Sequence, residues 1–287
     1  LGARKAEPER EAGGFQSPVF TFGLSARKPH SNRMQTEKRK TRRLYLIRHG
    51  QAGGEKYNEL TAPGRAQADA LGEYFASRNI AVHAAATGSL ERQRETYERF
   101  ASAYSKARPD APAPEARVVP GLDEIGPEIW FRLGEELRHK DDSFRDDFRA
   151  WTHSMRDSVD RRDPAVKAAY LRVLETVFRV WVSGKYATNE IETFQTFHKR
   201  VLTAATELPP EGDLVVISSG TPIALLTGAA LGFDLERSLY FTRRVANTSL
   251  SVYETKAVTG ESSAADRWDP ISINGLPHLS AEQATEI

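Results

Sequence analysis

The chain has 287 residues, of which 39% are hydrophobic, and it contains no cysteine. This length suits one α/β domain with an insertion, and the missing cysteines exclude a disulfide framework, a thiol nucleophile and a thiolate metal site. No apolar stretch approaches the ~20 residues of a membrane span, and the first residues lack the apolar segment of a signal peptide, so we expect a cytoplasmic protein with no membrane partner.

The net charge of +1 hides an uneven distribution. Residues 1–43 carry 11 Lys and Arg against 4 Asp and Glu, whereas the rest of the chain carries 29 against 35. Because the body of the protein is acidic, its overall field does not attract anions. A phosphate site would therefore have to rest on locally placed arginines and backbone amides.

The basic N-terminal part is predicted to be a disordered leader over residues 1–42. Residues 1–33 are rich in Gly, Pro, Ser and charge without a helix or strand period, and Met34 is a candidate for the natural start. The basic run at residues 38–43 favours a solvated stretch over a nucleic-acid partner, because it lacks interleaved aromatic residues.

The first predicted strand is the apolar run Leu44–Ile47, which is followed by Arg48, His49 and Gly50. Open α/β sheets build their sites at the carboxyl ends of their strands. Histidine is a nucleophile near neutral pH, and arginine offers a planar fork of donors to phosphate oxygens. A phosphoryl group on His49 is one hypothesis, and the alternative is a strand-ending histidine beside a surface arginine.

Helices and strands alternate along the next part of the chain. The pattern predicts a helix from a Thr61 cap to about Ser77, a strand near residues 80–87, a helix over residues 90–104 and a strand near residues 117–119. The last of these strands delivers Asp123 and Glu124.

Residues 127–207 show no convincing strand and are predicted to form several helices, among them residues 165–182 and 193–207. Most of their aromatic residues are expected to pack in the core rather than contact a ligand. We expect residues 127–191 to form a helical cap over the strand ends, where it would shape the choice of substrate.

A buried strand is predicted at Leu214–Ile217, and Ser219 and Gly220 then lead into a helix with Pro222 at its first position. A last strand over residues 249–254 is followed by a polar tail. Strands that alternate with helices predict an α/β fold with three layers, α/β/α, around a mostly parallel central sheet, with the helical cap as an insertion.

Three clusters at predicted strand ends share their order and spacing with a known family. They are Arg48-His49-Gly50-Gln51, Ser89-Leu90-Glu91-Arg92 with Thr96, and Leu122-Asp123-Glu124, supported by Leu60-Thr61 with Gly64 and Gln67, Glu192-Thr193-Phe194 with Arg200-Val201, and Asn274 with His278-Leu279. In this ordered set the chain resembles the histidine phosphatase superfamily, which includes the cofactor-dependent phosphoglycerate mutases. The resemblance spans residues 43–280 and leaves residues 281–287 as a tail.

The resemblance implies metal-independent phosphoryl transfer through a phosphohistidine, with no cofactor. His49 would attack in line, and Arg48 and Arg92 would grip the equatorial oxygens of the phosphoryl group. The residues implied at the phosphate are Arg48, Gly50, Gln51, Arg92, Ser219 and Gly220.

Glu124 matches the family's proton donor to the leaving group. Burial beside a phosphate would raise the pKa of this carboxyl, which favours the acid form. Asp123 is the second candidate, and both residues could instead cap a turn. Arg92 could pair with Glu95 on its own helix, and Gln51 could be an ordinary loop residue.

One position departs from the family pattern. Relatives usually carry a second histidine at the end of the late strand, where this chain has Ser219 and Gly220, and no histidine lies between His198 and His278. Serine donates one neutral hydrogen bond and has no positive charge. The loss of the charged histidine donor is expected to raise the barrier by roughly 2 to 4 kcal/mol, which backbone amides at the start of the following helix would offset in part.

These features favour a phosphatase that hydrolyses a phosphomonoester through His49. The alternative is a pseudophosphatase, a phosphate-binding protein with weakened catalysis. An efficient phosphoglycerate mutase is disfavoured, because a bisphosphorylated intermediate needs more positive donors than this site offers.

Overall fold

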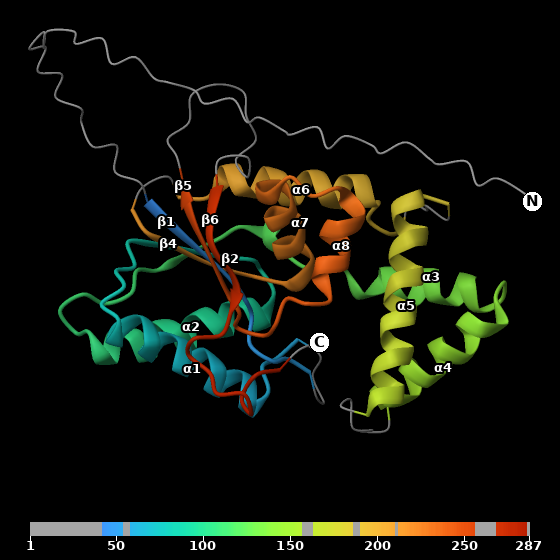
Figure 1. Cartoon of the computed structure of the whole chain (residues 1–287), viewed down its shortest axis with the longest axis horizontal. Helices are drawn as coiled ribbons and strands as arrows, with labels where there is room; N and C mark the ends of the chain where they lie inside the picture. Colours follow the sequence, from blue (N-terminus) through green and yellow to red (C-terminus); the bar gives the residue numbers. More distant parts are fainter. Residues whose placement is uncertain are drawn as a thin grey trace, which may run out of the picture. The chain divides into compact units, whose positions relative to one another are not determined.

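The structure is a computed structural model that describes residues 42–53, 58–156, 163–185, 190–209, 212–255 and 268–285 (Figure 1). The predicted leader lies outside these ranges except for its last residue, and so does Met34. The helices and strands are β1 Arg42–Arg48, α1 Ala62–Ser77, β2 Ala84–Thr87, α2 Glu91–Ala107, β3 Ala116–Val118, the 3-10 helix η1 Pro120–Leu122, α3 Pro127–Arg138, α4 Asp142–Arg156, α5 Pro164–Ser183, α6 Phe194–Glu207, β4 Leu214–Ser218, α7 Gly220–Leu231, α8 Leu235–Thr242, β5 Leu250–Thr255 and β6 Trp268–Gly275.

Six strands form one mixed sheet in the order β3-β2-β4-β1-β5-β6. The four strands β1 to β4 run parallel to one another, whereas β5 is antiparallel to β1 and β6 is antiparallel to β5. Helices cover both faces of the sheet (Figure 1). The predicted α/β class with a mostly parallel sheet is therefore confirmed.

The central strand β1 shows how the two helical layers arise. Its side chains alternate between the faces of the sheet. Leu44 and Leu46 belong to a hydrophobic core shared with α6 and α7, whereas Tyr45 and Ile47 pack in a second core with α1 and α2. A strand buried on both faces needs an unbroken apolar run, which is what the sequence contains at this point.

Helices α3, α4 and α5 pack on one another around aromatic side chains and lie to one side of the sheet in Figure 1. Phe144, Phe148, Phe178 and Trp181 are buried, as expected from their spacing, whereas Phe131 is 45% exposed. Because α3 begins three residues after Glu124, this helical segment leaves the sheet at the edge where the parallel strands end.

The expected polar tail after the last strand was wrong, because residues Trp268–Gly275 form strand β6 at the edge of the sheet. Pro270 lies inside β6, and half of the residues of this strand are exposed. An edge strand tolerates proline since one row of its backbone groups has no strand to pair with. Because of this proline and the weak alternation of apolar residues, the sequence pattern did not predict this strand.

Two element bounds differ from expectation, and one further helix was not predicted. Helix α7 begins at Gly220, so Pro222 is its third residue rather than its first. The strand expected near residues 80–87 starts only at Ala84, where it pairs with β4. Helix α8, for which no element was predicted, is eight residues long and begins after an Asp234 cap that accepts from the N–H of Arg237 at 2.8 Å.

Candidate active site

The carboxyl ends of the parallel strands bring the predicted site residues to one edge of the sheet. Arg48 pairs with Ser218 between β1 and β4, and the N–H of His49 donates to the carbonyl of Ser218 at 2.9 Å. Strand β2 flanks β4 on its other side, so α2, which begins at Glu91, starts at the same edge. His49, Ser219 and the first turn of α2 are therefore brought together.

The ring of His49 is 6% exposed and bonded at both nitrogens. Its Nδ1 lies 2.7 Å from the carbonyl oxygen of Gly50, and its Nε2 lies 3.1 Å from Nε of Arg92. A carbonyl only accepts and a guanidinium N–H only donates, so Nδ1 carries the hydrogen and Nε2 presents its lone pair. This tautomer turns the more reactive nitrogen toward Arg92.

The pKa of His49 is held well below its ordinary value, first by burial and then by the positive charges of Arg92 and Arg48. The hydrogen bond to Gly50 opposes this shift without reversing it. The imidazole is consequently neutral near pH 7. A neutral ring keeps the lone pair that a nucleophile needs.

Arg92 lies in the first turn of α2 and is 6% exposed. Besides its contact with His49, its Nη1 donates to Oδ1 of Asn58 at 2.9 Å. The alternative of a surface pair with Glu95 was wrong, because that carboxylate accepts from Arg65 and from the N–H of Leu60 instead. Arg92 thus points into the site.

Arg48 is the last residue of β1 and is partly buried. Its Nη1 donates to the carbonyl of Val245 at 2.5 Å, which holds the side chain at the carboxyl edge. Its charge is near enough to lower the pKa of His49. Two guanidinium groups beside one neutral imidazole suit a bound dianion such as a phosphoryl group.

Gly50 allows two backbone segments to approach closely behind His49. Its N–H donates to Oγ1 of Thr96 at 3.0 Å, and a Cβ at this position would lie 2.5 Å from the carbonyl oxygen of Gly64. Any side chain would therefore push the His49 segment away from α1.

Gln51 is held by its backbone and its side chain. Its N–H donates to Oε1 of Gln67 at 2.9 Å, and its own Oε1 accepts from the hydroxyl of Thr61 at 2.8 Å. Thr61 is also the cap of α1, as predicted, and accepts from the N–H of Gly64 at 3.1 Å. The side-chain oxygen of Gln51 is thus bonded within the protein, which leaves its nitrogen for another partner.

Glu124 meets the start of α7. Its Oε2 accepts from the N–H of Thr221 at 3.0 Å, and its Oε1 accepts from the N–H of Ile125 at 3.0 Å. A Cβ on Gly220 would lie 3.8 Å from Oε2, so Glu124 and Gly220 are neighbours. The positive end of α7 holds this carboxyl at the same edge as His49.

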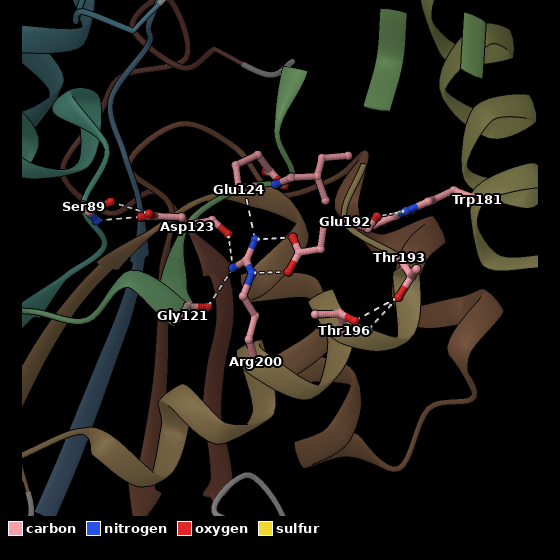
Figure 2. A network of polar contacts seen from close by, with 10 residues as sticks. Ser89, Gly121, Asp123, Glu124, Trp181, Glu192, Thr193, Thr196 and Arg200 are labelled. Carbon is pink, nitrogen blue, oxygen red and sulfur yellow. Dashed lines mark hydrogen bonds and ion pairs between the residues drawn. The ribbon is translucent and has the colours of Figure 1, made fainter. Parts of the chain in front are cut away.

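Asp123, the second candidate for the acid, is engaged elsewhere. One carboxylate oxygen accepts from the N–H of Ser89 at 2.6 Å, and the other accepts from the hydroxyl of Ser89 (Figure 2). Asp123 thus ties the loop before α2 to the loop that carries Glu124.

A role for Arg200 was not apparent from the sequence. Its Nη1 donates to the carbonyls of Gly121 and Asp123 at 3.1 and 2.9 Å, and its Nη2 donates to that of Glu124 at 3.4 Å (Figure 2). Its Nε and Nη2 also donate to both carboxylate oxygens of Glu192, at 2.8 and 3.0 Å. Arg200 therefore clamps the backbone that carries the candidate acid, a function for which only its place in the family pattern was a signal.

The chain near its C-terminus also holds the His49 segment, which no sequence signal indicated. Nδ2 of Asn247 donates to the carbonyl of His49 at 3.3 Å, while its Oδ1 accepts from the hydroxyl of Thr285 at 3.0 Å. Nε2 of Gln67 donates to the carbonyl of Gln283 at 2.9 Å and to Oγ1 of Thr285 at 2.8 Å. The two amides that hold residues 49 and 51 thus share one hydroxyl.

Within the described ranges, no group of three or more His, Cys, Asp or Glu side chains is placed to hold a metal ion. Among the same residues, no helix combines the length and apolar character needed to cross a membrane.

The family model of the histidine phosphatase superfamily, branch 1, matches the chain over residues 44–180 and 164–265. No protein of curated function matches the chain by sequence.

Several solved structures resemble this one. Phosphoserine phosphatase from Entamoeba histolytica, in complex with 3-phosphoglyceric acid, is 17% identical with a TM-score of 0.50, covering 83% of this chain and 99% of that one. A mycobacterial protein described as hydrolase 2 is 19% identical with a TM-score of 0.49, covering 84% and 94%. Mycobacterial glucosyl-3-phosphoglycerate phosphatase is 18% identical with a TM-score of 0.46, covering 82% and 99%. At 17% identity, the similarity to the phosphoserine phosphatase shows a shared fold and no more.

Proposed function

The chain belongs to branch 1 of the histidine phosphatase superfamily, and from this we propose that it is a metal-independent phosphatase that hydrolyses a phosphomonoester through a phosphohistidine on His49. The observation that carries the proposal is the state of the His49 ring. Its Nδ1 is bonded to Gly50 and its Nε2 faces Arg92 at 3.1 Å, with a pKa well below the ordinary value. This is a neutral nucleophile beside a cation that can hold its substrate.

In the first step, the lone pair on Nε2 of His49 attacks the phosphorus atom. A nitrogen–phosphorus bond forms, and the bond from phosphorus to the oxygen of the alcohol breaks. Arg48 and Arg92 donate to the equatorial oxygens, where negative charge is spread in the transition state. When the substrate binds, the N–H of Arg92 that donates to Nε2 of His49 donates to a phosphoryl oxygen instead.

Glu124 supplies the proton that the leaving oxygen needs. In the second step its carboxylate takes a proton from water, which attacks phosphorus and breaks the bond to His49. Inorganic phosphate leaves, His49 is again neutral and Glu124 again carries its proton. The contact of Glu124 with α7 supports the position required for this assignment, because it holds the carboxyl at the edge where His49 lies.

We infer that Ser219 stands where relatives carry a second histidine. It follows β4, lies at the start of α7 and is fully buried. A hydroxyl there donates one neutral hydrogen bond to the phosphoryl group, so slower chemistry than that of a two-histidine site is expected. The same loss of charge disfavours a mutase, which must hold two phosphoryl groups.

A second candidate function rests on the same residue. If the neutral Ser219 leaves too little stabilisation of the transition state, the two arginines still form a phosphate-binding site. The protein would then recognise a phosphorylated small molecule without rapid turnover.

The test is hydrolysis of p-nitrophenyl phosphate in EDTA between pH 5 and 8 by three proteins. The wild type is compared with His49→Ala and with the matched control His83→Ala. His83 is exposed before β2, and its Nδ1 accepts from the N–H of Asp213, at the opposite edge of the sheet. We expect turnover in the wild type and the control, and a loss of about a thousandfold or more in His49→Ala.

Chemical quenching identifies the intermediate. The wild type should carry a phosphoryl group that survives alkali and is lost in acid, whereas His49→Ala should carry none. Equal turnover by wild type and His49→Ala would exclude His49 as the nucleophile. Phosphate binding without turnover in EDTA would favour the second candidate.

A further inference from the structure

Gln93 follows Arg92 in the first turn of α2 and is fully buried. Its Oε1 accepts from the N–H of Leu90 at 3.2 Å, and its Nε2 donates to the carbonyl of Leu122 at 3.1 Å and to Oγ of Ser219 at 2.9 Å. Because a backbone N–H only donates and a carbonyl only accepts, the two ends of this amide cannot be exchanged.

The orientation of Gln93 decides the role of the Ser219 hydroxyl. Both hydrogens of Nε2 are used, one on Leu122 and one on Ser219, so Oγ of Ser219 is an acceptor in this contact. The hydroxyl hydrogen must then point away from Gln93, since two hydrogens cannot occupy the same contact. A hydroxyl that accepts a hydrogen bond is also polarised and becomes a better donor.

The hydroxyl of Ser219 does not donate this hydrogen to the first turn of its own helix, α7. It occupies the cap position of α7 with an extended backbone, a place where serine commonly bonds the first turn, yet it makes no side-chain capping bond. In the part of the chain that the structure describes, the contact with Gln93 is the hydrogen bond recorded for Oγ. The hydrogen remains available at the edge where β1 and β4 end beside His49.

We propose that Gln93 is a positioning residue that directs the hydroxyl hydrogen of Ser219 to a phosphoryl oxygen. The proposal rests on the proposed function only in placing a phosphoryl group at His49. Gln93 and Arg92 are adjacent on α2, so the same helix turn supplies one direct donor and sets the direction of a second. A neutral pair, Gln93 and Ser219, thereby supplies an oriented donor without a second imidazole.

The test is a double-mutant cycle read by calorimetric binding of inorganic phosphate in EDTA. The four proteins are the wild type, Gln93→Met, Ser219→Ala and the double variant. Methionine keeps the length of glutamine and removes its hydrogen bonds. We expect each single variant to weaken phosphate binding about fivefold, the size of one neutral hydrogen bond, and the double variant to match Ser219→Ala.

A merely structural role of Gln93 predicts a different cycle. Loss of the bonds to Leu90 and Leu122 would act equally with or without the Ser219 hydroxyl, so the two effects would multiply to about 25-fold. That result overturns the proposal. Glu98→Ala, on the exposed face of the same helix, is the control for effects of α2 itself and should bind phosphate as the wild type does.

Two further outcomes keep the proposals separable. If Gln93→Met does not fold, Ser219→Ala alone decides, because unchanged phosphate binding would show that the hydroxyl donates nothing and would overturn the proposal. If the wild type hydrolyses aryl phosphate and the two substitutions have multiplicative effects, the proposed phosphatase activity is retained and the role of Gln93 is overturned. If the wild type shows no turnover but the double variant matches Ser219→Ala, the role of Gln93 is retained and the phosphatase activity is overturned. A wild type that binds no phosphate overturns both.

Discussion

The protonation of His49 controls both its reactivity and its share of the stability of the protein. The ring is buried between the guanidinium groups of Arg48 and Arg92, and its pKa in the folded state is well below the value of 6.5 expected when unfolded. As the pH falls below 6.5, His49 is protonated in the unfolded chain but stays neutral in the folded protein. The stabilisation is thus present above pH 6.5 and is lost as the pH falls toward the folded pKa.

His49→Ala is expected to make the protein less sensitive to acid. Between pH 7.5 and 5.5, the free energy of unfolding of the wild type should fall by about 1 kcal/mol more than that of the variant. Urea titrations at the two pH values measure this difference. A wild type and variant that lose stability in parallel would mean that His49 titrates alike in both states.

The same shift predicts the acid limb of catalysis. If His49 is the nucleophile, as proposed, its ring stays neutral well below pH 6.5, and kcat/KM for aryl phosphate should not fall with a midpoint near 6.5 once the second ionisation of the substrate is allowed for. A pH profile of the wild type from pH 8 to 5 gives the midpoint. A fall centred at 6.5 would contradict the buried, arginine-flanked environment of His49.

At the scale of elements, α6 controls the loop that presents the candidate acid. Arg200 reaches from α6 to three backbone carbonyls, those of Gly121, Asp123 and Glu124, while both oxygens of Glu192 bond its guanidinium. The pair is partly buried, with side chains 26% and 21% exposed. Arg200 therefore contributes to stability more through its hydrogen bonds to these carbonyls than through the attraction between the two charges.

Arg200→Met should lower kcat about tenfold or more and leave KM less affected, because the proposed proton donor, Glu124, would lose its position while the proposed phosphate ligands, Arg48 and Arg92, would keep theirs. The free energy of unfolding should fall by about 2 kcal/mol. Steady-state kinetics and urea unfolding measure the two effects. A rise in KM at constant kcat would assign Arg200 to substrate binding instead.

Arg179→Ala is the matched control. This arginine pairs with Glu175 four residues earlier on α5, with 71% of its side chain exposed. Pairs of this kind contribute little, so stability should change by less than about 0.5 kcal/mol and kcat should stay the same.

The segment near residue 285 is a second element that supports the site from a distance. Oγ1 of Thr285 accepts from Gln67 and donates to Asn247, and these two amides hold the backbone of Gln51 and His49. Thr285→Val keeps the shape and removes the hydroxyl. It should cost about 1 to 2 kcal/mol of stability and several-fold in kcat/KM, as two buried amides lose a partner.

Thr206→Val on α6 separates this effect from the general cost of losing a hydroxyl. Thr206 is exposed, and its hydroxyl donates to the carbonyl of Thr203 in the same helix. The control should change neither stability nor kcat/KM measurably. Equal behaviour of the two variants would remove Thr285 from the support of the site.

At the scale of the whole molecule, the buried strands were the most predictable parts. Leu44–Ile47 and Leu214–Ile217 are unbroken apolar runs, and both form neighbouring central strands. The convergence of His49, Arg92 and Glu124 also followed from the sequence, since parallel strands end at one edge. These inferences depend on local periodicity and on topology, which a sequence carries directly.

What the sequence did not reveal depends on contacts between distant residues. Strand β6 exists because β5 offers an edge, and its own apolar pattern is interrupted by Pro270. The bonds of Arg200, Thr285 and Gln93 join a side chain to groups that have no fixed spacing from it in the chain. The residues that we propose to contact a phosphoryl group could thus be placed at one edge of the sheet from the sequence, whereas the side chains that hold them there could not.

Helices α3 to α5 and the sheet share one continuous hydrophobic core, which includes side chains from β1, β4, α5 and α6. Trp181 of α5 is one link between them, because its ring contacts Phe194 and Phe197 of α6 with centroids 5.2 Å apart in each case, and its Nε1 donates to the carbonyl of Glu192 at 2.7 Å. A shared core predicts that the helical segment and the sheet unfold together.

Unfolding by urea should therefore show one transition when followed by two probes. Trp130, Trp151 and Trp181 report on α3 to α5, whereas Trp268 belongs to β6. In a Trp268→Phe background, tryptophan fluorescence and far-ultraviolet circular dichroism should give the same midpoint. A fluorescence midpoint at lower urea would mean that the helical segment opens before the sheet.

Truncating the link should separate the two parts. Trp181→Ala removes a buried ring and should cost about 3 to 5 kcal/mol, with the fluorescence transition of the two remaining helical tryptophans moving ahead of the circular dichroism. Trp181→Phe keeps most of the packing and loses the bond to Glu192, so it should cost less and leave the transitions coincident. If both variants unfold in one step, other core contacts couple α3 to α5 to the sheet, and Trp181 contributes packing energy without being the joint.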